Sequence, residues 1–86
     1  MIRIFSTPSF LREYNKLPLG LQEDVRERIE IFRRDPRDAS LKLHKLHGPL
    51  KGFWSFSVNY RFRIVVQKDA NGVYALLAVG DHNVYR

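Results

Sequence analysis

Three strand-like segments fill the second half of the chain and constrain its fold more than any other feature. Residues 53–58 and 61–67 alternate between apolar and polar side chains, which is typical of strands with one buried face. Asn71-Gly72 favours a tight hairpin turn because both residues tolerate positive φ. Residues 73–79, which follow this turn, are apolar on both faces, as expected of a central strand. With Asn59-Tyr60 as the other turn, the sequence predicts a run of three antiparallel strands.

The first half of the chain predicts one short strand and two helices. Residues 1–5 alternate as a strand, after which Thr7 is a favourable helix N-cap and Pro8 fits the first helical position. Pro18 stops this first helix, and a second one is predicted over residues 19–34. The apolar stripe of the second helix consists of Leu21, Val25, Ile29 and Phe32. Because the linker at Pro18 is short, the two helices are expected to form an antiparallel hairpin.

This order predicts an α+β fold, β-α-α-β-β-β, with a mainly antiparallel twisted sheet and the helical hairpin packed on one face. The 86 residues leave room for one domain with a modest core. The side chains expected to face the helices are Trp54, Phe56, Val58, Phe62, Ile64 and Val66. The opposite sheet face would present Ser55, Ser57, Arg61 and Arg63 as an open, polar and cationic surface, flanked by the loop before the strands and the tail 80–86.

The charge is uneven along the chain and predicts an anionic partner. The formal net charge is +6, and residues 41–67 contain no Asp or Glu. The cations of this stretch are Lys42, Lys45, Lys51, Arg61 and Arg63. A segment of one sign and this length favours a binding surface for nucleic acid or an acidic protein over a simply solvated face.

The expected compartment is the cytoplasm, and no membrane contact is expected. The chain has no cysteine, which excludes disulfides and thiolate metal sites and fits a reducing environment. No apolar run approaches the roughly 20 residues that a membrane helix needs. The first ten residues lack the apolar core of a signal peptide.

The residues suited to chemistry gather between positions 43 and 63, where a histidine-bearing basic loop runs into an aromatic strand. Histidine can accept or donate a proton near neutral pH, and the planar guanidinium of arginine can bond two phosphate oxygens at once. His44 and His47 are three residues apart with no carboxylate near them in sequence. A metal site needs three or four convergent ligands, so we expect neither metal nor other cofactor.

The sequence resembles the RelE/ParE superfamily of type II toxin–antitoxin toxins, on the RNA-cleaving side that includes the RelE, YoeB, YafQ and HigB groups. The resemblance covers nearly the whole chain through the β-α-α-β-β-β order, LHKLHGPLKGFWSFSVN, RFRIVV and the closing GDHNVYR. Its most specific part is G-x-L-x-G-x-W-S at Gly48 to Ser55. The resemblance implies a RelE-like domain over residues 1–86 that cleaves mRNA, on the ribosome near the 16S rRNA of the A site or in free solution. It also implies neutralisation by a cognate antitoxin.

The resemblance also implies roles for individual residues. Arg63 matches best the strand arginine that contacts the scissile phosphate, and Arg61 is the alternative. His44 and His82 match histidines of the YafQ group and are the candidates for proton transfer, without an assignment of acid and base. Tyr85 matches a C-terminal tyrosine that would join the proton transfer or orient the attacking oxygen. The expected contacts to the RNA backbone are Lys42, Lys45, His47, Lys51 and Arg61.

Two other functions remain open at this point. Ser57 stands where many relatives have a basic residue or histidine, so the pattern mixes subgroups of the family. A ParE-like inhibitor of DNA gyrase would need the same fold but no proton-transfer residues. A non-catalytic nucleic-acid-binding module would retain RNA without requiring its 2′-OH, and its affinity would fall steeply with salt.

Overall fold

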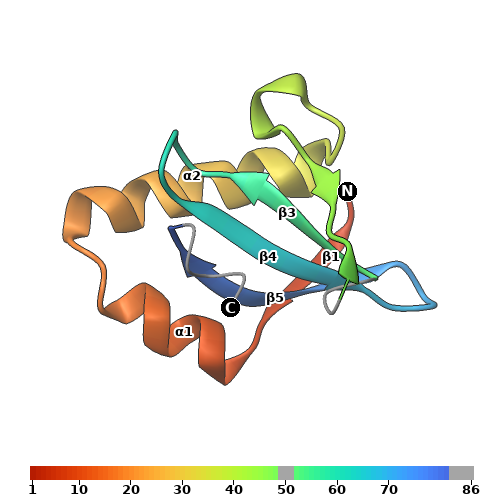
Figure 1. Ribbon diagram of the computed structural model, residues 1–86, viewed down its shortest axis with the longest axis horizontal. Helices are drawn as coiled ribbons and strands as arrows, with labels where there is room; N and C mark the ends of the chain where they lie inside the picture. Colours follow the sequence, from red (N-terminus) through yellow and green to blue (C-terminus); the bar gives the residue numbers. More distant parts are fainter. Residues whose placement is uncertain (49–51, 82–86) are drawn as a thin grey trace.

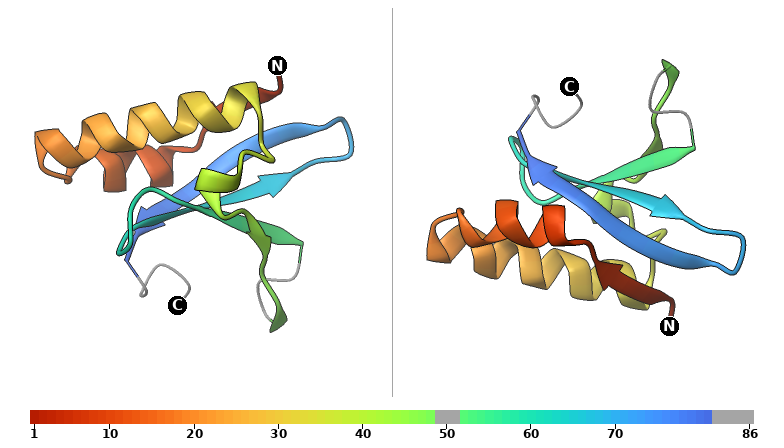
Figure 2. Two further views of the ribbon diagram at one scale, coloured as in Figure 1. Left: turned by 90° about the horizontal axis from the view of Figure 1, so that it is seen from above. Right: turned by 90° about the horizontal axis from the view of Figure 1, so that it is seen from below.

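The computed structural model describes residues 1–48 and 52–81, which form one mixed sheet with two helices on one of its faces (Figures 1 and 2). The elements are β1 (Arg3–Ser6), α1 (Pro8–Asn15), α2 (Leu19–Arg34), the 3-10 turn η1 (Ala39–Leu41), β2 (His44–Lys45), β3 (Phe53–Ser57), β4 (Arg63–Lys68) and β5 (Val73–Gly80). The sheet order is β1-β5-β4-β3-β2, and only the β1–β5 pair is parallel. The predicted α+β class and mainly antiparallel sheet are therefore confirmed.

The helical hairpin is fixed at both ends of α1 by side-chain hydrogen bonds. The Thr7 hydroxyl accepts from the N–H of Phe10 at 3.2 Å and donates to the carbonyl of Leu76 in β5 at 2.8 Å, so the predicted N-cap also ties the helix to the sheet. At the other end, the Gln22 side chain donates to the carbonyls of Tyr14 at 3.0 Å and Leu17 at 3.2 Å. Both carbonyls lie at or just after the C-terminal end of α1. The short linker thus folds α2 back along α1.

The core lies between α2 and the sheet. Phe32 of α2 stacks on Phe56 of β3 with ring centroids 4.5 Å apart and meets Tyr74 of β5 edge-on at 4.9 Å. Phe32 and Phe56 are both fully buried. Of the six strand residues predicted to face the helices, Phe56, Val58, Ile64 and Val66 are buried, while Trp54 and Phe62 are partly buried and pack against the core. The alternation in the sequence therefore identified the buried face correctly.

The first turn of the sheet differs from the prediction, and the difference moves one arginine. Asn59 does not form a two-residue turn: its side-chain oxygen accepts from the N–H groups of Arg61 and Phe62, both at 2.8 Å. The N–H of Val58 then donates to the carbonyl of Phe62 at 2.9 Å and closes a longer loop. As a consequence, β4 begins at Arg63, and Arg61 is an exposed loop residue instead of a strand neighbour of Arg63.

A β-bulge in the β4–β5 pair interrupts the alternation of β5. Val65 pairs with Ala78, but its neighbour Val66 pairs with Leu76, which leaves Leu77 as the extra residue. Val79 rather than Ala78 therefore lies opposite Ile64 and is buried in the core. Simple period-two counting along β5 misses this shift, because an inserted residue exchanges the two faces.

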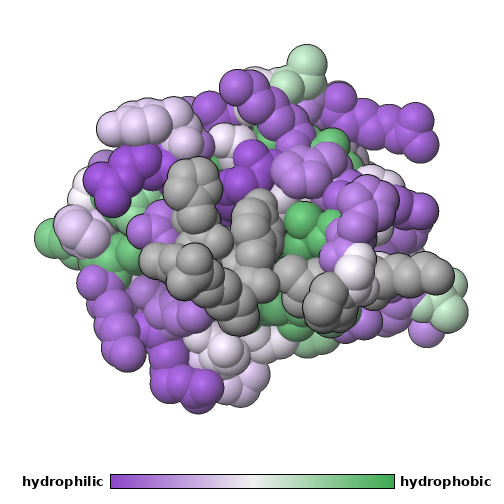
Figure 3. Space-filling model, in the orientation of Figure 1, coloured by the Kyte–Doolittle hydropathy of each residue, from purple (hydrophilic) through white to green (hydrophobic). Residues whose placement is uncertain are grey.

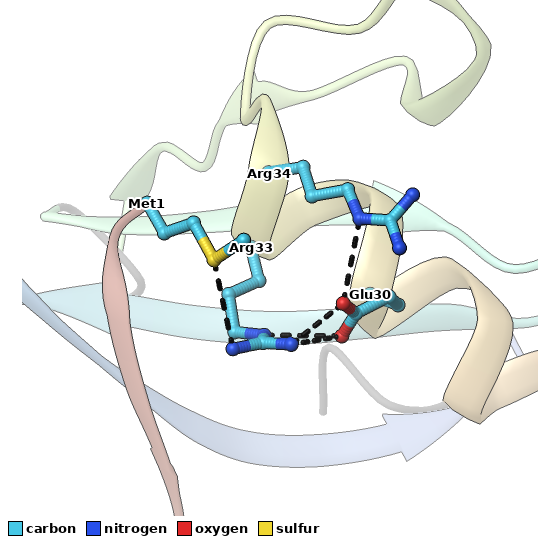
Figure 4. A network of polar contacts seen from close by, with 4 residues as sticks. All are labelled: Met1, Glu30, Arg33 and Arg34. Carbon is cyan, nitrogen blue, oxygen red and sulfur yellow. Dashed lines mark hydrogen bonds and ion pairs between the residues drawn. The ribbon is translucent and has the colours of Figure 1, made fainter.

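A cluster of polar contacts joins the end of α2 to the beginning of the chain (Figure 4). Arg33 and Glu30 form an ion pair at 2.6 Å, and Arg34 reaches the same carboxylate at 3.4 Å. The Arg33 guanidinium also contacts the sulfur of Met1 at 3.8 Å, while the Arg33 carbonyl accepts from the N–H of Ile2 at 3.1 Å. Hydrogen bonds from Arg33 hold the pKa of Glu30 below its usual value. Within the described segments, neither helix has the length and apolar character that crossing a bilayer requires.

Candidate functional site

Arg63 is the centre of the candidate site, on the sheet face that points away from the helices. It is the first residue of β4, between Ser57 of β3 and Gly80 of β5 in the strand register. Its Nε donates to the hydroxyl of Ser55 at 3.0 Å, and its Nη2 donates to the carbonyls of Lys42 at 2.9 Å and Ser55 at 3.4 Å. Contacts from two separate segments thus hold the guanidinium in place. No hydrogen bond within the described residues uses its Nη1, whose two N–H groups remain available to a ligand.

His44 lies beside this guanidinium because β2 adds its short strand to β3. The pairing of His44 with Ser55 puts the imidazole Nδ1 3.3 Å from Arg63 Nη2 and 3.3 Å from the Lys42 carbonyl. The tautomer decides which contact is a hydrogen bond. If Nδ1 donates its proton to Lys42, Nε2 is unprotonated and can accept a proton. If Nδ1 accepts from Arg63, Nε2 carries a proton that it can donate.

Lys42 supplies the carbonyl that joins the two side chains, and its backbone conformation is unusual. It ends η1 with φ of 50°, in the left-handed region, and is the non-glycine residue with positive φ in the described part of the chain. This conformation costs a side-chain-bearing residue about 1–2 kcal/mol relative to the right-handed region. Asp38 stabilises the turn by accepting from the N–H of Ser40 at 2.9 Å. The turn directs the Lys42 carbonyl toward Arg63 and leaves the Lys42 side chain exposed.

The two serines of β3 lie under the site instead of lining an open surface. Ser55 is 0% exposed and Ser57 is 8% exposed, contrary to the expectation of a solvent-open polar face. Ser57 donates its hydroxyl proton to the carbonyl of Asn59 at 2.8 Å, so it stabilises the loop before β4. Ser55 supports Arg63 from below through its side chain and its carbonyl. Hydrophilic residues predominate over the coloured surface on this side of the molecule (Figure 3).

The other candidate residues are dispersed. Lys45 projects from β2 to the side opposite His44, where its ammonium lies 5.5 Å from the centre of the Trp54 ring. Arg61 is exposed, with its guanidinium 5.8 Å from the Phe62 ring, and His47 is an exposed loop residue. Lys51, His82 and Tyr85 lie outside the described residues. Among the residues that the structure describes, no three histidine or acidic side chains converge as metal ligands.

Glu13 is a residue near the site that the sequence did not single out. Its carboxylate accepts from the N–H of Val79 at 3.1 Å. The register of β1 with β5 ends at Ser6 and Leu76, so α1 instead of a strand lies beside the last part of β5. Glu13 takes the place of a strand partner just before Gly80, the residue opposite Arg63. From sequence alone, a glutamate on an amphipathic helix is expected to be a surface residue. Only the tertiary structure shows that the Glu13 carboxylate accepts a hydrogen bond from the backbone of β5.

We expect Glu13→Ala to destabilise the protein by about 1–3 kcal/mol, because it leaves the N–H of Val79 without an acceptor in a partly buried position. Glu13→Gln keeps a side-chain oxygen and should lose less than half of that. Urea unfolding followed by circular dichroism measures both. Glu27→Ala on the exposed side of α2 is the matched control and should stay within about 0.5 kcal/mol of the wild type. Equal losses for Glu13→Ala and Glu27→Ala would show that the contact to Val79 contributes nothing.

The comparisons with known proteins agree with this architecture. No protein-family model matches the sequence, and a search of curated proteins finds no match. Among solved structures, the fold is similar to a YoeB/ParE toxin from Agrobacterium tumefaciens, with a TM-score of 0.76, 19% identity, and coverage of 94% of this chain and 99% of that one. It is also similar to a chain of the toxin–antitoxin complex RelBE2 from Mycobacterium tuberculosis, with a TM-score of 0.78, 21% identity, and coverage of 94% and 98%.

A third similar structure is YafQ from E. coli strain BL21(DE3), with a TM-score of 0.76, 13% identity, and coverage of 99% of this chain and 98% of that one. At such identities the likeness establishes the fold. The chain therefore has the fold of toxins of the RelE, YoeB, YafQ and ParE type, as the resemblance of its sequence predicted.

Proposed function

We propose that this chain is the toxin of a type II toxin–antitoxin system and that it cleaves mRNA as a metal-independent endoribonuclease in the cytoplasm, on the ribosome near the A site. The observation that carries this proposal is the junction of Arg63 with His44. A guanidinium held by fixed acceptors lies 3.3 Å from an exposed imidazole on one sheet face. The fold shared with toxins, one of them solved in a toxin–antitoxin complex, supports the same reading.

The proposed reaction uses the RNA's own 2′-hydroxyl as the nucleophile. A base removes the 2′-OH proton, O2′ forms a bond to the adjacent phosphorus, and the bond from phosphorus to O5′ breaks in line. An acid delivers a proton to the departing O5′. The products are a 2′,3′-cyclic phosphate and a 5′-hydroxyl end, so no water molecule is consumed in this step. Proton transfer by positioned side chains contributes typically about 10²–10⁴-fold to the rate of such a reaction.

Arg63 is proposed to bind the scissile phosphate. Its Nη1 offers two N–H groups to the phosphoryl oxygens, where negative charge accumulates in the transition state. Because the other side of the guanidinium is already held by Lys42 and Ser55, little reorganisation accompanies the reaction. His44 is proposed to transfer a proton through Nε2, the ring nitrogen that the Lys42 and Arg63 contacts leave unused.

The remaining roles extend the proposal beyond this pair. His82 is the second candidate for proton transfer, and Tyr85 joins that transfer or orients the 2′-oxygen. Lys42, whose exposed side chain belongs to the same junction, is proposed to contact flanking phosphates. The exposed His47 and Arg61, together with Lys45 and Lys51, are proposed as more distant contacts to the RNA backbone.

Cleavage mapping in a translation extract tests this function. Purified protein is added to a defined message, and new 5′ ends are mapped by primer extension with and without a block to ribosome loading. We expect new ends that depend on loaded ribosomes and that vanish when the nucleotide 5′ to the scissile phosphate is 2′-deoxy. Ends that persist without ribosomes would contradict only the ribosome dependence. If folded protein produces no new ends, the nuclease assignment is wrong. Inhibition of DNA gyrase is then the function to measure.

A further inference from the structure

A groove of about 850 Å³ lies at one end of the sheet and is separate from the Arg63 site. It is bounded by the segment after α2, the beginning of β1 and the far end of the β4–β5 hairpin, which meet on one side of the molecule (Figure 1). The larger apolar residues of its lining are Ile2, Leu43, Trp54 and Tyr74. Neither Arg63 nor His44 lines it. This volume lies within the range of ligand-binding clefts, about 300–1,000 Å³.

The lining of the groove is apolar and aromatic but incompletely covered. Leu43 and Trp54 are only partly buried, although both pack against the core. Lys45 lies over the Trp54 ring and Lys68 over the Tyr74 ring, at 5.5 and 5.9 Å from the ring centres. Partly exposed aromatic surface with charged groups around it is typical of protein-binding sites, because burying that surface stabilises the complex.

The rim carries both signs of charge, but its acids are engaged locally. Asp38 accepts from the N–H and the hydroxyl of Ser40, at 2.9 and 2.6 Å, and these bonds lower its pKa. Asp35 accepts from the N–H of Arg37 at 3.1 Å. In the described part of the chain, by contrast, Lys42 and Lys68 take part in no ion pair. The charged residues that line the groove, Asp35, Arg37, Asp38, Lys42 and Lys68, sum to a net charge of +1.

We propose that this groove docks an acidic peptide segment that packs a large apolar side chain against Trp54 and Leu43, the partly exposed apolar residues of its lining. Its carboxylates would pair with Lys68 and Lys42 while the apolar side chain covers the aromatic lining. The inference rests on the proposed function in one respect, since an antitoxin is the partner in which such a segment is expected. Lys42 lines this groove, and its carbonyl accepts a hydrogen bond from Arg63, so the docked segment lies next to the Arg63 site.

Charge favours a peptide over RNA as the occupant. RNA carries one phosphate per nucleotide at a regular spacing, so it cannot keep its charges away from Asp35 and Asp38, which both line the groove. Surfaces that track a nucleic-acid backbone are predominantly of one sign. A peptide can place its carboxylates at the lysines and its apolar side chain on the aromatic rings, which matches the mixed character of this rim.

Trp54 makes the proposal directly measurable, because it is the only tryptophan of the sequence and lines the groove. The probe is the acetylated, amidated peptide Glu-Asp-Leu-Phe-Asp-Glu, which contains no tryptophan or tyrosine and is titrated into the full chain while Trp54 fluorescence is recorded. We expect a saturable change. The peptide with Ser-Ser in place of Leu-Phe has the same charge and should bind at least about tenfold more weakly, because it loses the apolar burial.

Charge reversal at the rim supplies the matched comparison. Lys68→Glu should weaken binding of the Leu-Phe peptide about five- to tenfold at low salt, since an attraction becomes a repulsion. Lys16→Glu makes the same change of charge on the exposed cap of α1, away from the groove, and should alter binding less than about twofold. Thermal unfolding confirms that both variants are folded. Absence of a saturable signal, or equal weakening by both variants, would overturn the proposal.

A 2′-O-methyl RNA hexanucleotide serves as the competing probe. If it changes Trp54 fluorescence with the same dependence on Lys68, the groove binds nucleic acid and the peptide proposal is wrong. The cleavage assay separates this inference from the proposed function. RNA cleavage without peptide binding by the wild-type protein would overturn only the docking site, and peptide binding without cleavage would overturn only the nuclease.

Discussion

Cleavage of RNA by the Arg63→Ala variant is expected to fall by about 10²–10³-fold, the loss typical of removing one preorganised donor from a developing negative charge. The expectation follows from the contacts that fix the guanidinium to Ser55 and to the Lys42 carbonyl while leaving Nη1 for the phosphate. Arg63→Lys should recover only part of the activity. It restores a positive charge but not the planar fork that bonds two oxygens together. Primer extension on a defined message, with rates from a time course, measures these losses.

Arg61→Ala is the matched control for this prediction. It removes the same kind of side chain two positions earlier, from an exposed loop that makes none of the Arg63 contacts. Cleavage should fall by less than about tenfold, because only the attraction to phosphate is weakened. Because Arg63 also holds the Lys42 carbonyl, its removal costs about 1 kcal/mol of folding stability, and circular dichroism checks that the variant is folded. Wild-type cleavage rates from folded Arg63→Ala protein would end the assignment of the phosphate to this residue.

Phe32→Ala is expected to destabilise the fold by about 3–5 kcal/mol, the usual loss when a fully buried phenylalanine is truncated. Phe32 stacks on Phe56 and meets Tyr74 edge-on, so its ring joins α2 to two strands of the sheet. A domain of this size has only about 5–10 kcal/mol of total stability, so the variant should be partly unfolded at 37 °C. Urea unfolding at 15 and 25 °C measures the loss.

Phe5→Ala controls for the loss of a phenylalanine as such. Phe5 lies in the edge strand β1 and is 52% exposed, so its truncation should lower the free energy of unfolding by less than about 1 kcal/mol. A loss for Phe32→Ala no larger than that for Phe5→Ala would mean that α2 packs on the sheet less tightly than the ring contacts indicate.

Local patterns in the sequence were sufficient for most of the fold. Thr7 and Pro8 marked the beginning of α1, and the stripe of Val25 and Phe32 identified the buried side of α2. Alternation placed Phe56 and Ile64 on the helix side of the sheet. These features depend on capping, on the helical period and on the pleat of a strand, all of which act over a few residues.

The short elements were not predictable in the same way. β2 consists of His44 and Lys45 alone, and only its pairing with Ser55 and Trp54 makes it a strand. Two residues are too few to show a period, so their conformation is decided by the edge of β3 that they cover. The bulge at Leu77 likewise depends on the pairing between β4 and β5.

The sequence by itself determined that this chain folds as a helical hairpin on a mainly antiparallel sheet, and it placed Arg63 and His44, with His82 and Tyr85, among the candidates for RNA chemistry. Only the tertiary structure decided that the side chains of Arg63 and His44 meet. It also decided that Arg61 and Lys45 lie away from this pair, beside the rings of Phe62 and Trp54. Finally, it showed that Glu13 bonds to the backbone of β5, the strand next to Arg63. The reason is physical: periodicity and capping act between near neighbours in sequence, whereas this site requires side chains from β2 and β4 to converge with the Lys42 carbonyl. Their separation in space depends on strand register and backbone direction, which the packed sheet fixes.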